Sequence, residues 1–79
     1  MDNLLCDIAD GLFELNDNEN ALRLYADALK FNNYNPIACY GSGRCYLLTE
    51  AKEKAKRMLI NAVEIDPFFD KAKKLLDTL

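Results

Sequence analysis

Apolar side chains recur along the chain at steps of three and four residues, the spacing that gathers them on one face of an α-helix. In the first stretch the pattern runs through Leu4, Leu5, Ile8, Leu12 and Leu15. In the second stretch it runs through Ala21, Leu24, Tyr25, Ala28, Leu29 and Phe31. The polar segment NDNEN, residues 16–20, separates the two, and its Asn and Asp side chains favour helix starts. The pattern therefore predicts two amphipathic helices joined by a short turn.

Two residue pairs ending in proline predict where later helices begin. Asn35 is suited to cap a helix whose first residue is Pro36, where the missing N–H does no harm. Asp66 and Pro67 are interpreted as the same device at the start of the last helix, and Thr49 as the cap of the helix before it. The expected architecture is all-α, with five antiparallel helices near residues 2–15, 18–32, 36–48, 50–65 and 67–78.

The chain also repeats itself with a period of 34 residues. An ungapped shift by this period brings small residues onto small and large onto large. The aligned pairs include Ala9 with Gly43, Ala21 with Ala55, Ala28 with Ala62, Leu29 with Val63 and Phe31 with Ile65. A recurring packing surface requires such a match. We therefore expect two copies of a helical hairpin, about 2–35 and 36–69, and a last helix at about 67–78.

This pattern resembles the tetratricopeptide repeat, a helix–turn–helix unit with the signature W-x2-L-G-x2-Y…A-x3-F…P. In the second unit its places hold Cys39, Ser42, Gly43, Tyr46, Ala55, Leu59 and Pro67. In the first unit they hold Leu5, Ile8, Ala9, Leu12, Ala21 and Tyr25. Neither unit has tryptophan, and Asn33 replaces the proline of the first. The resemblance implies a single domain over residues 1–79, built as a short right-handed α-solenoid with a closing helix, and a non-catalytic protein-binding role.

The stretch CYGSGRCY, residues 39–46, raises the question of a ligand-binding loop. A phosphate-binding glycine loop follows a strand and opens a helix, and no strand is expected before Gly41. The stretch is therefore expected inside a helix, where two glycines cost about 2 kcal/mol relative to alanine. The resemblance gives Gly43 the place where paired helices approach closely. It gives Gly41 no such place, and the sequence offers no packing role for that residue.

The cysteines are three in number, and the chain has no histidine. An odd set favours reduced thiols in an intracellular compartment, cytoplasmic or nuclear. Cys39 and Cys45 lie about 120° apart around a helix, so they do not converge on one metal ion. Without histidine, no thiolate and base pair can be assembled from Cys6 and its neighbours. We expect no metal, no cofactor and no enzymatic activity, and we assign the cysteines to packing.

Composition and charge narrow the class of partner. Of the 79 residues, 51% are hydrophobic and 29% charged, as in one small globular domain. The net charge is −3, and a nucleic-acid-binding protein usually carries a stronger basic patch, so no nucleic-acid partner is expected. The run KEKAKR, residues 52–57, is explained by a solvated helix face. No apolar run approaches the roughly 18 residues of a membrane span, so no membrane partner is expected.

The resemblance implies that the first helix of each pair lines a concave groove where a partner peptide or helix would lie. The residues at these places are Asn3, Cys6, Asp10, Phe13, Ile37, Tyr40, Arg44, Leu47, Lys71 and Lys74. Their mixture of apolar and charged groups suits a peptide with apolar anchors. Equally, Phe13, Ile37 and Leu47 could be half-buried packing residues. Capture of a chaperone's C-terminal carboxylate is disfavoured, because the places used for it hold Cys6, Asp10 and Gly41.

Two other functions stay open at this point. An RNA-binding helical repeat has units of similar length, but it should show a basic groove. A purely structural spacer in a larger assembly would have no ligand of its own. Since about three repeats are usually needed for stability, we expect the chain to be part of a longer array, such as its C-terminal end. In isolation, its exposed first-repeat edge is expected to self-associate.

Overall fold

Five α-helices follow one another in the computed structural model, which describes the backbone of residues 2–79 and the side chains of residues 4–79. They are α1 (Asp2–Glu14), α2 (Asn18–Phe31), α3 (Pro36–Leu48), α4 (Lys52–Ile65) and α5 (Asp70–Asp77). No strand occurs within residues 2–79. The predicted all-α architecture with five helices is confirmed.

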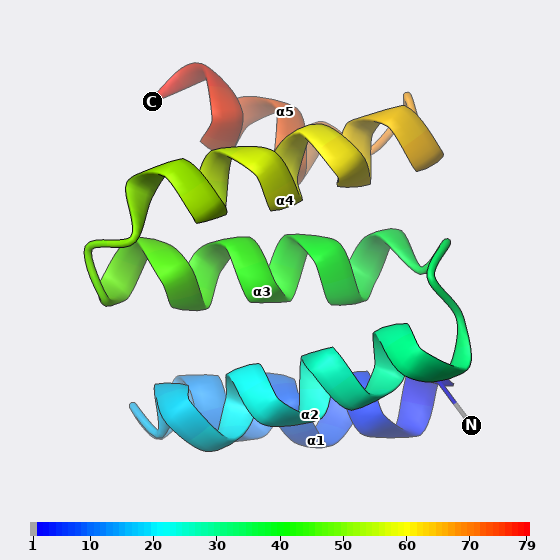
Figure 1. Ribbon diagram of the computed structural model, residues 1–79, viewed down its shortest axis with the longest axis vertical. Helices are drawn as coiled ribbons and strands as arrows, with labels where there is room; N and C mark the ends of the chain where they lie inside the picture. The colour runs from blue at the N-terminus through cyan, green and yellow to red at the C-terminus, as the bar shows by residue number, and fades with distance from the viewer. Residues whose placement is uncertain (1) are drawn as a thin grey trace.

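The helices pack as two hairpins followed by a closing helix. α1 packs against α2, and α3 packs against α4. α3 also packs against α2 and touches α1, so it lies between the first hairpin and α4, as Figure 1 shows. α5 packs against α4 at the other end. This stacking of helical hairpins is the short repeat solenoid that the sequence predicts. None of the described helices has both the length and the apolar character that crossing a bilayer requires.

The turn that closes each hairpin has the same geometry. Asn16 has φ 66° and Glu50 has φ 63°, both in the left-handed region, and the two residues are 34 positions apart. In each turn the next amide donates to a carbonyl five residues earlier, at 2.8 and 2.9 Å. These bonds run from Asp17 to Leu12 and from Ala51 to Tyr46. Both first helices therefore end in a Schellman motif, which satisfies carbonyl groups that the helix leaves free.

The connections that follow the second helices also match. The side chain of Asn32 accepts a hydrogen bond from the amide of Tyr34 at 3.0 Å. The side chain of Asp66 accepts one from the amide of Phe68 at 3.1 Å. Asp66 is the C-cap residue of α4 and not the N-cap of α5, which begins at Asp70 after Phe69. The predicted start at residue 67 is wrong by three positions, whereas the 34-residue period counted from Pro36 leads to residue 70.

Of the three residues predicted as helix caps, Asn35 is confirmed, whereas Asp66 and Thr49 are wrong. The Asn35 side chain accepts hydrogen bonds from two amides at the start of α3, at 3.0 and 3.3 Å, and Pro36 is the first residue of that helix. Asp17, in the polar segment, caps α2 by accepting a bond from the amide of Asn20 at 3.4 Å. Thr49 instead ends α3, because its hydroxyl donates to two carbonyl groups of that helix. α4 then begins after Ala51 without a side-chain cap.

The glycines of α3 mark two close helix contacts. A Cβ atom at Gly43 would lie 2.9 Å from Cγ of Leu59, so this glycine lets α3 and α4 approach closely, as predicted. A Cβ atom at Gly41 would lie within 2.6 Å of three ring atoms of Tyr25. Gly41 therefore lets the Tyr25 ring of α2 rest on the α3 backbone. This is the packing role that the sequence alone does not offer.

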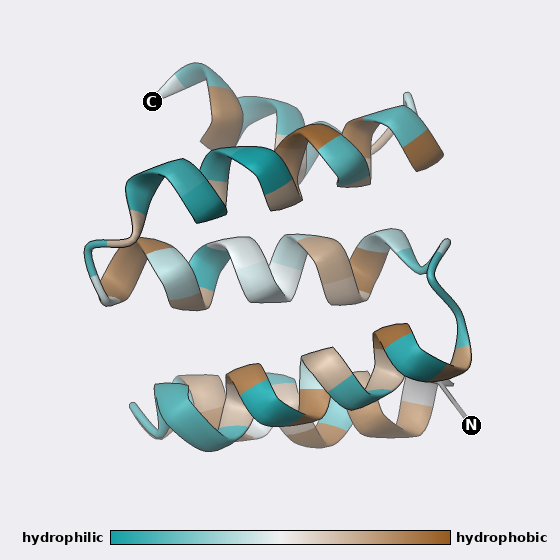
Figure 2. Ribbon diagram, in the orientation of Figure 1, coloured by the Kyte–Doolittle hydropathy of each residue, from teal (hydrophilic) through white to brown (hydrophobic). Residues whose placement is uncertain are grey.

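The core is built largely from small side chains. Its main cluster consists of Cys6, Ala9, Ala21, Tyr25, Ala28, Ala38 and Cys45. A second cluster consists of Cys39, Leu59, Ala62 and Ala72. Figure 2 shows hydrophilic and hydrophobic segments alternating along α2 and α4, whereas the middle of α3 is near neutral because glycine and serine occupy it. All three cysteines are buried, which confirms their assignment to packing.

Candidate functional site

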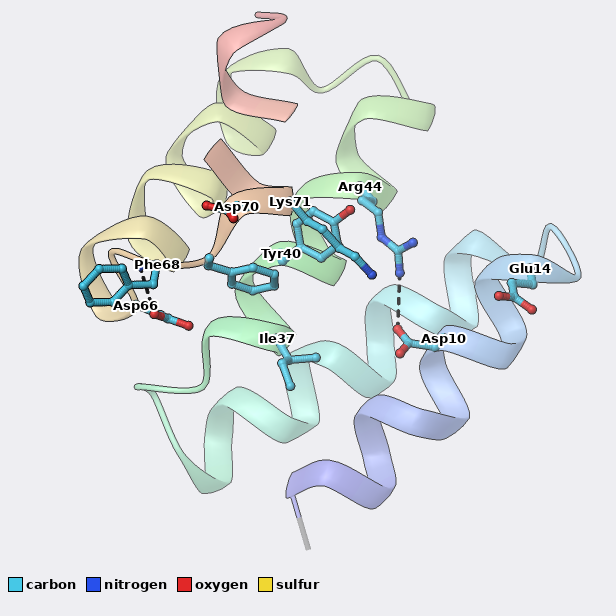
Figure 3. A pocket seen from close by; sticks show the side chains of 10 residues that line it. Asp10, Glu14, Ile37, Tyr40, Arg44, Asp66, Phe68, Asp70 and Lys71 are labelled. Carbon is cyan, nitrogen blue, oxygen red and sulfur yellow. Dashed lines mark hydrogen bonds and ion pairs between the residues drawn. The ribbon is translucent and has the colours of Figure 1, made fainter. Parts of the chain in front are cut away.

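A pocket of about 540 Å³ lies where α1, α3 and the start of α5 meet. Figure 3 shows that its lining side chains come from both hairpins and from the turn before α5. The lining residues are Asp10, Glu14, Ile37, Tyr40, Arg44, Asp66, Phe68, Phe69, Asp70 and Lys71. A volume of this size is within the range of about 300–1,000 Å³ found for ligand sites.

Half of the ten predicted groove residues line this pocket. They are Asp10, Ile37, Tyr40, Arg44 and Lys71. Phe13 lies next to it, because its ring contacts Arg44. Leu47 and Lys74 are not part of the lining. Cys6 is only 1% exposed and belongs to the core, so placing it among partner contacts was wrong. The side chain of Asn3 lies outside the described residues.

The other five lining residues were missed from sequence. They are Glu14, Asp66, Phe68, Phe69 and Asp70. Four of them lie in the α4–α5 turn or at the first residue of α5. The expected helix start at residue 67 placed Phe68, Phe69 and Asp70 inside a helix instead of in or just after a turn. The 34-residue period was the signal that could have found them, since it makes Phe68 the counterpart of Tyr34 in the preceding turn.

A hydrogen-bonded group joins three helices at one wall of the pocket. The Arg44 guanidinium of α3 pairs with the Asp10 carboxylate of α1, with 3.2 Å between Nη2 and Oδ1. The same nitrogen donates to the Tyr25 hydroxyl of α2 at 3.2 Å. The Tyr25 hydroxyl in turn donates to Asp10. Each charge in this group has a partner, which a partly buried ion pair requires.

Aromatic rings hold the Arg44 side chain from other directions. Its guanidinium carbon lies 4.2 Å from the ring centroid of Phe13 and 5.0 Å from that of Tyr40. Such cation–π contacts add to the ion pair. Tyr40 also meets Phe69, with ring centroids 5.1 Å apart. The pocket wall is therefore fixed by contacts between α1, α3 and the residue before α5.

Burial raises the pKa of three side chains, one of them, Tyr25, at this wall. It raises the pKa of Tyr25 well above its usual value, and the hydrogen bond to Asp10 adds to the rise while Arg44 opposes it. Tyr25 therefore stays protonated at neutral pH and can act as a donor. Burial also raises the pKa of the Cys39 and Cys45 thiols. This shift is opposite to the one that activates a nucleophilic cysteine.

Exposed apolar groups and unpaired acids form the rest of the lining. Phe68 is 88% exposed and Ile37 is 43% exposed. Exposed apolar side chains of this size beside a pocket are features of sites that bind other molecules. Glu14 and Asp70 are exposed as well, and Asp66 is partly exposed. The pocket can therefore offer apolar contact and hydrogen-bond acceptors to the same ligand.

Comparison with known proteins supports one family. The family model described as tetratricopeptide repeat matches residues 12–79. Comparison with curated proteins gave no match. The matched region covers most of the chain, and its stacked helical hairpins agree with the family. The chain therefore belongs to the tetratricopeptide repeat family, whose members generally act as non-catalytic protein–protein interaction modules.

Proposed function

We propose that this chain binds a segment of a partner protein, an extended peptide or a helix, in the pocket formed by α1, α3 and the α4–α5 turn. The observation that carries the proposal is the position of the pocket. It lies on the side where the first helices of the hairpins meet the closing helix, and it includes five of the residues that the repeat pattern places there. Ile37 and Phe68 are exposed apolar groups on which a partner side chain can pack.

The prearranged wall favours binding. Arg44 is held by Asp10, Tyr25 and the Phe13 ring, and Tyr40 is held by Phe69. Side chains that are already ordered lose less conformational entropy when a ligand binds. Such a surface suits a short segment that brings its own apolar anchor.

The two alternative functions have less support. An RNA-binding groove would present free basic groups, but four of the six charged lining residues are acidic, and Arg44 is paired with Asp10. A purely structural spacer would leave its pocket without a ligand. The spacer alternative predicts that substitutions in the pocket leave every partner bound.

Selection from a displayed library of random dodecapeptides tests the proposal. Each selected peptide is then mapped by the changes it causes in amide NMR shifts. We expect these changes in α1, in α3 and at residues 66–71. Replacing both Ile37 and Phe68 with serine should weaken binding about tenfold or more, because apolar anchors carry much of the binding energy. The variant Phe31→Ser is the control, since Phe31 is also exposed but does not line the pocket.

Two results would contradict the proposal. One is the selection of peptides whose shift changes fall on the outer faces of α2 and α4. The other is an affinity that the double substitution leaves unchanged. Either result would place the binding surface elsewhere on the chain.

We also propose that α1 associates with a second copy of the chain, as the exposed first-repeat edge predicts. Leu4 and Ile8 are exposed, whereas their counterparts one period later, Ala38 and Ser42, are buried. Ala38 and Ser42 lie on α3, which packs on the preceding hairpin, whereas no described element covers the equivalent face of α1. Sedimentation equilibrium should show a concentration-dependent dimer that the double variant Leu4→Ser and Ile8→Ser abolishes. A wild-type chain that remains monomeric at every concentration would contradict this.

A further inference from the structure

The charges that line the pocket are unbalanced. Asp10 and Arg44 neutralise each other through their 3.2 Å ion pair. The charged lining residues that remain are Lys71 and three acids, Glu14, Asp66 and Asp70. Among the described side chains, these three acids make no ion pair. Outside the Asp10–Arg44 pair, the lining therefore carries three acids against one cation, an excess of two negative charges.

Arg44 does not offset this excess for an incoming ligand. Its Nη2 atom already binds Asp10 and the Tyr25 hydroxyl, and its face lies against the Phe13 ring. A partner carboxylate would therefore share a guanidinium whose charge Asp10 already balances. Lys71 is the lining cation that forms no ion pair among the described side chains.

The acids that form no ion pair among the described side chains lie at both ends of the pocket, and apolar side chains lie between them. Figure 3 shows Glu14 and Asp66 at opposite ends of the lining, with Ile37 and Tyr40 between them. Phe68 lies beside Asp66 in the same view, and Asp66 accepts the amide of Phe68 through Oδ1. An apolar side chain in the middle would therefore have carboxylates on both sides.

Resting on the proposed function, we propose that the pocket selects a cationic segment of the partner protein. The segment has an apolar or aromatic anchor that packs on Ile37, Tyr40 and Phe68. Lys or Arg residues on both sides of the anchor face Glu14 at one end and Asp66 and Asp70 at the other. Complementary charge of this kind sets specificity and association rate more than total affinity.

Four synthetic peptides that share a labelled nine-residue frame test this inference. One has a Leu-Phe-Leu centre with two lysines on each side, and two others carry glutamate or glutamine in place of the lysines. The fourth keeps the lysines and has serine at the centre. Fluorescence anisotropy should give the lysine peptide about tenfold tighter binding than the glutamate peptide in 0.1 M salt, where charges act over about 10 Å. In 1 M salt the range falls to about 3 Å, and the preference should shrink to about twofold.

Matched charge variants locate the effect. The double variant Glu14→Gln and Asp70→Asn should reduce the preference for lysine about fivefold, because two of the three unpaired acids are neutralised. The control Glu53→Gln and Glu64→Gln removes the same charge from α4, outside this pocket, and should leave the preference nearly intact. The serine-centred peptide should bind weakly to all of these proteins.

Each of the following outcomes would overturn the inference. Equal or tighter binding of the glutamine or glutamate peptide, with NMR shift changes at the pocket, would reject the charge preference and leave the peptide-binding function intact. Lysine binding that survives the serine centre, or that the α4 control reduces as much as the pocket variant, would show non-specific attraction. Failure of all four peptides to bind would also reject the cationic ligand. The peptide-binding function itself fails separately, when library-selected peptides map outside the pocket.

Discussion

The two hairpins have the same turns and the same period, yet they differ at one buried position of the second helix. Tyr25 in α2 and Leu59 in α4 are 34 residues apart, and both are fully buried. Both rest on a glycine of α3, Tyr25 on Gly41 and Leu59 on Gly43. Leu59 ends in hydrocarbon, whereas the hydroxyl of Tyr25 reaches a polar group at the pocket wall.

This difference separates what the repeat determines from what it leaves open. The repeat position determines that a large side chain is buried against α3. It does not determine whether that side chain carries a polar group. In the second hairpin the position serves packing alone. In the first hairpin it also connects the core to Asp10 and Arg44, so a change at Tyr25 should be felt at the pocket.

The largest effect is expected from Gly41→Ala, which places a methyl group inside the ring of Tyr25. The ring is fully buried and hydrogen-bonded, so it cannot move away freely. Overpacking of this kind costs about 3 kcal/mol or more, beyond the gain of about 1 kcal/mol from removing a helical glycine. Urea denaturation should show the loss. The double variant Gly41→Ala with Tyr25→Leu should recover part of it, and a single variant as stable as the wild type would contradict the contact.

Gly43→Ala should have a smaller effect in the same direction. The added Cβ would lie 2.9 Å from Cγ and 3.0 Å from Cδ2 of Leu59, a flexible side chain that can shift more easily than a ring. We expect a net loss of about 1 kcal/mol in the free energy of unfolding. Gly11→Ala is the matched control, because nothing lies within 4 Å of its Cβ position, and it should stabilise the chain by about 0.5–1 kcal/mol. If both α3 variants lose the same stability, the two glycine contacts are equivalent after all.

Tyr25→Phe removes only the polar part of the difference between the hairpins. It should lower the free energy of unfolding by about 1 kcal/mol at neutral pH, because Asp10 and Arg44 lose a hydrogen-bond partner.

The same variant should change the response to high pH. The usual pKa of tyrosine is 10.0, and that of Tyr25 in the folded chain is raised. Below pH 10 the hydroxyl is protonated in both states; above it, the unfolded chain releases the proton and the folded chain retains it, so stability falls as pH rises. The wild type should lose up to about 1.4 kcal/mol per pH unit more than Tyr25→Phe in this window. Denaturation at about pH 8 and about pH 11 measures this, and parallel curves would show that Tyr25 does not titrate differently in the two states.

The smallest expected effect is a gain from Ala51→Asp. Asp17 caps α2, but its counterpart Ala51 precedes α4 without a cap, although the two residues have nearly the same backbone angles. An aspartate at this position should stabilise the chain by about 1 kcal/mol or less. Thermal denaturation measures the gain, with Ala51→Asn as the uncharged comparison. No gain from either substitution would mean that the equivalence of the two turns does not extend to their caps.

Most of the fold could be predicted from sequence because the 34-residue period and the apolar spacing act locally. Asn35 fulfilled its predicted capping role, and Asp17 caps α2 from within the polar segment predicted to start that helix, since a short polar side chain bonds to the nearest free amides. Asp66 was misread because the same chemistry also forms a turn with the amide two residues later. The pair Asp66–Pro67 resembles the pair Asn35–Pro36 at the start of α3. α5 nevertheless begins at Asp70, which is 34 residues after Pro36, and not at Pro67.

The pocket could be predicted only in part because tertiary packing decides it. The predicted groove residues Ile37 and Tyr40 line the same pocket. The same prediction included Cys6, which the approach of α1 to the rest of the core buries. The 34-residue period places Phe68 in a turn, but whether that turn lies beside the pocket depends on how α5 packs. The role of Gly41 likewise depends on a ring from another helix.

The two buried glycines have a consequence for how the chain unfolds. α3 carries both of them, so its own helical tendency is low, and it gains order from the helices on its two sides. Loss of either neighbour should therefore also melt α3, which removes the support of the other neighbour. Repeat arrays can unravel unit by unit when neighbours are weakly coupled. Here α3, whose own helical tendency is low, is also the helix against which both α2 and α4 pack. Native-state hydrogen exchange should therefore report α2 and α4 opening as a single cooperative unit.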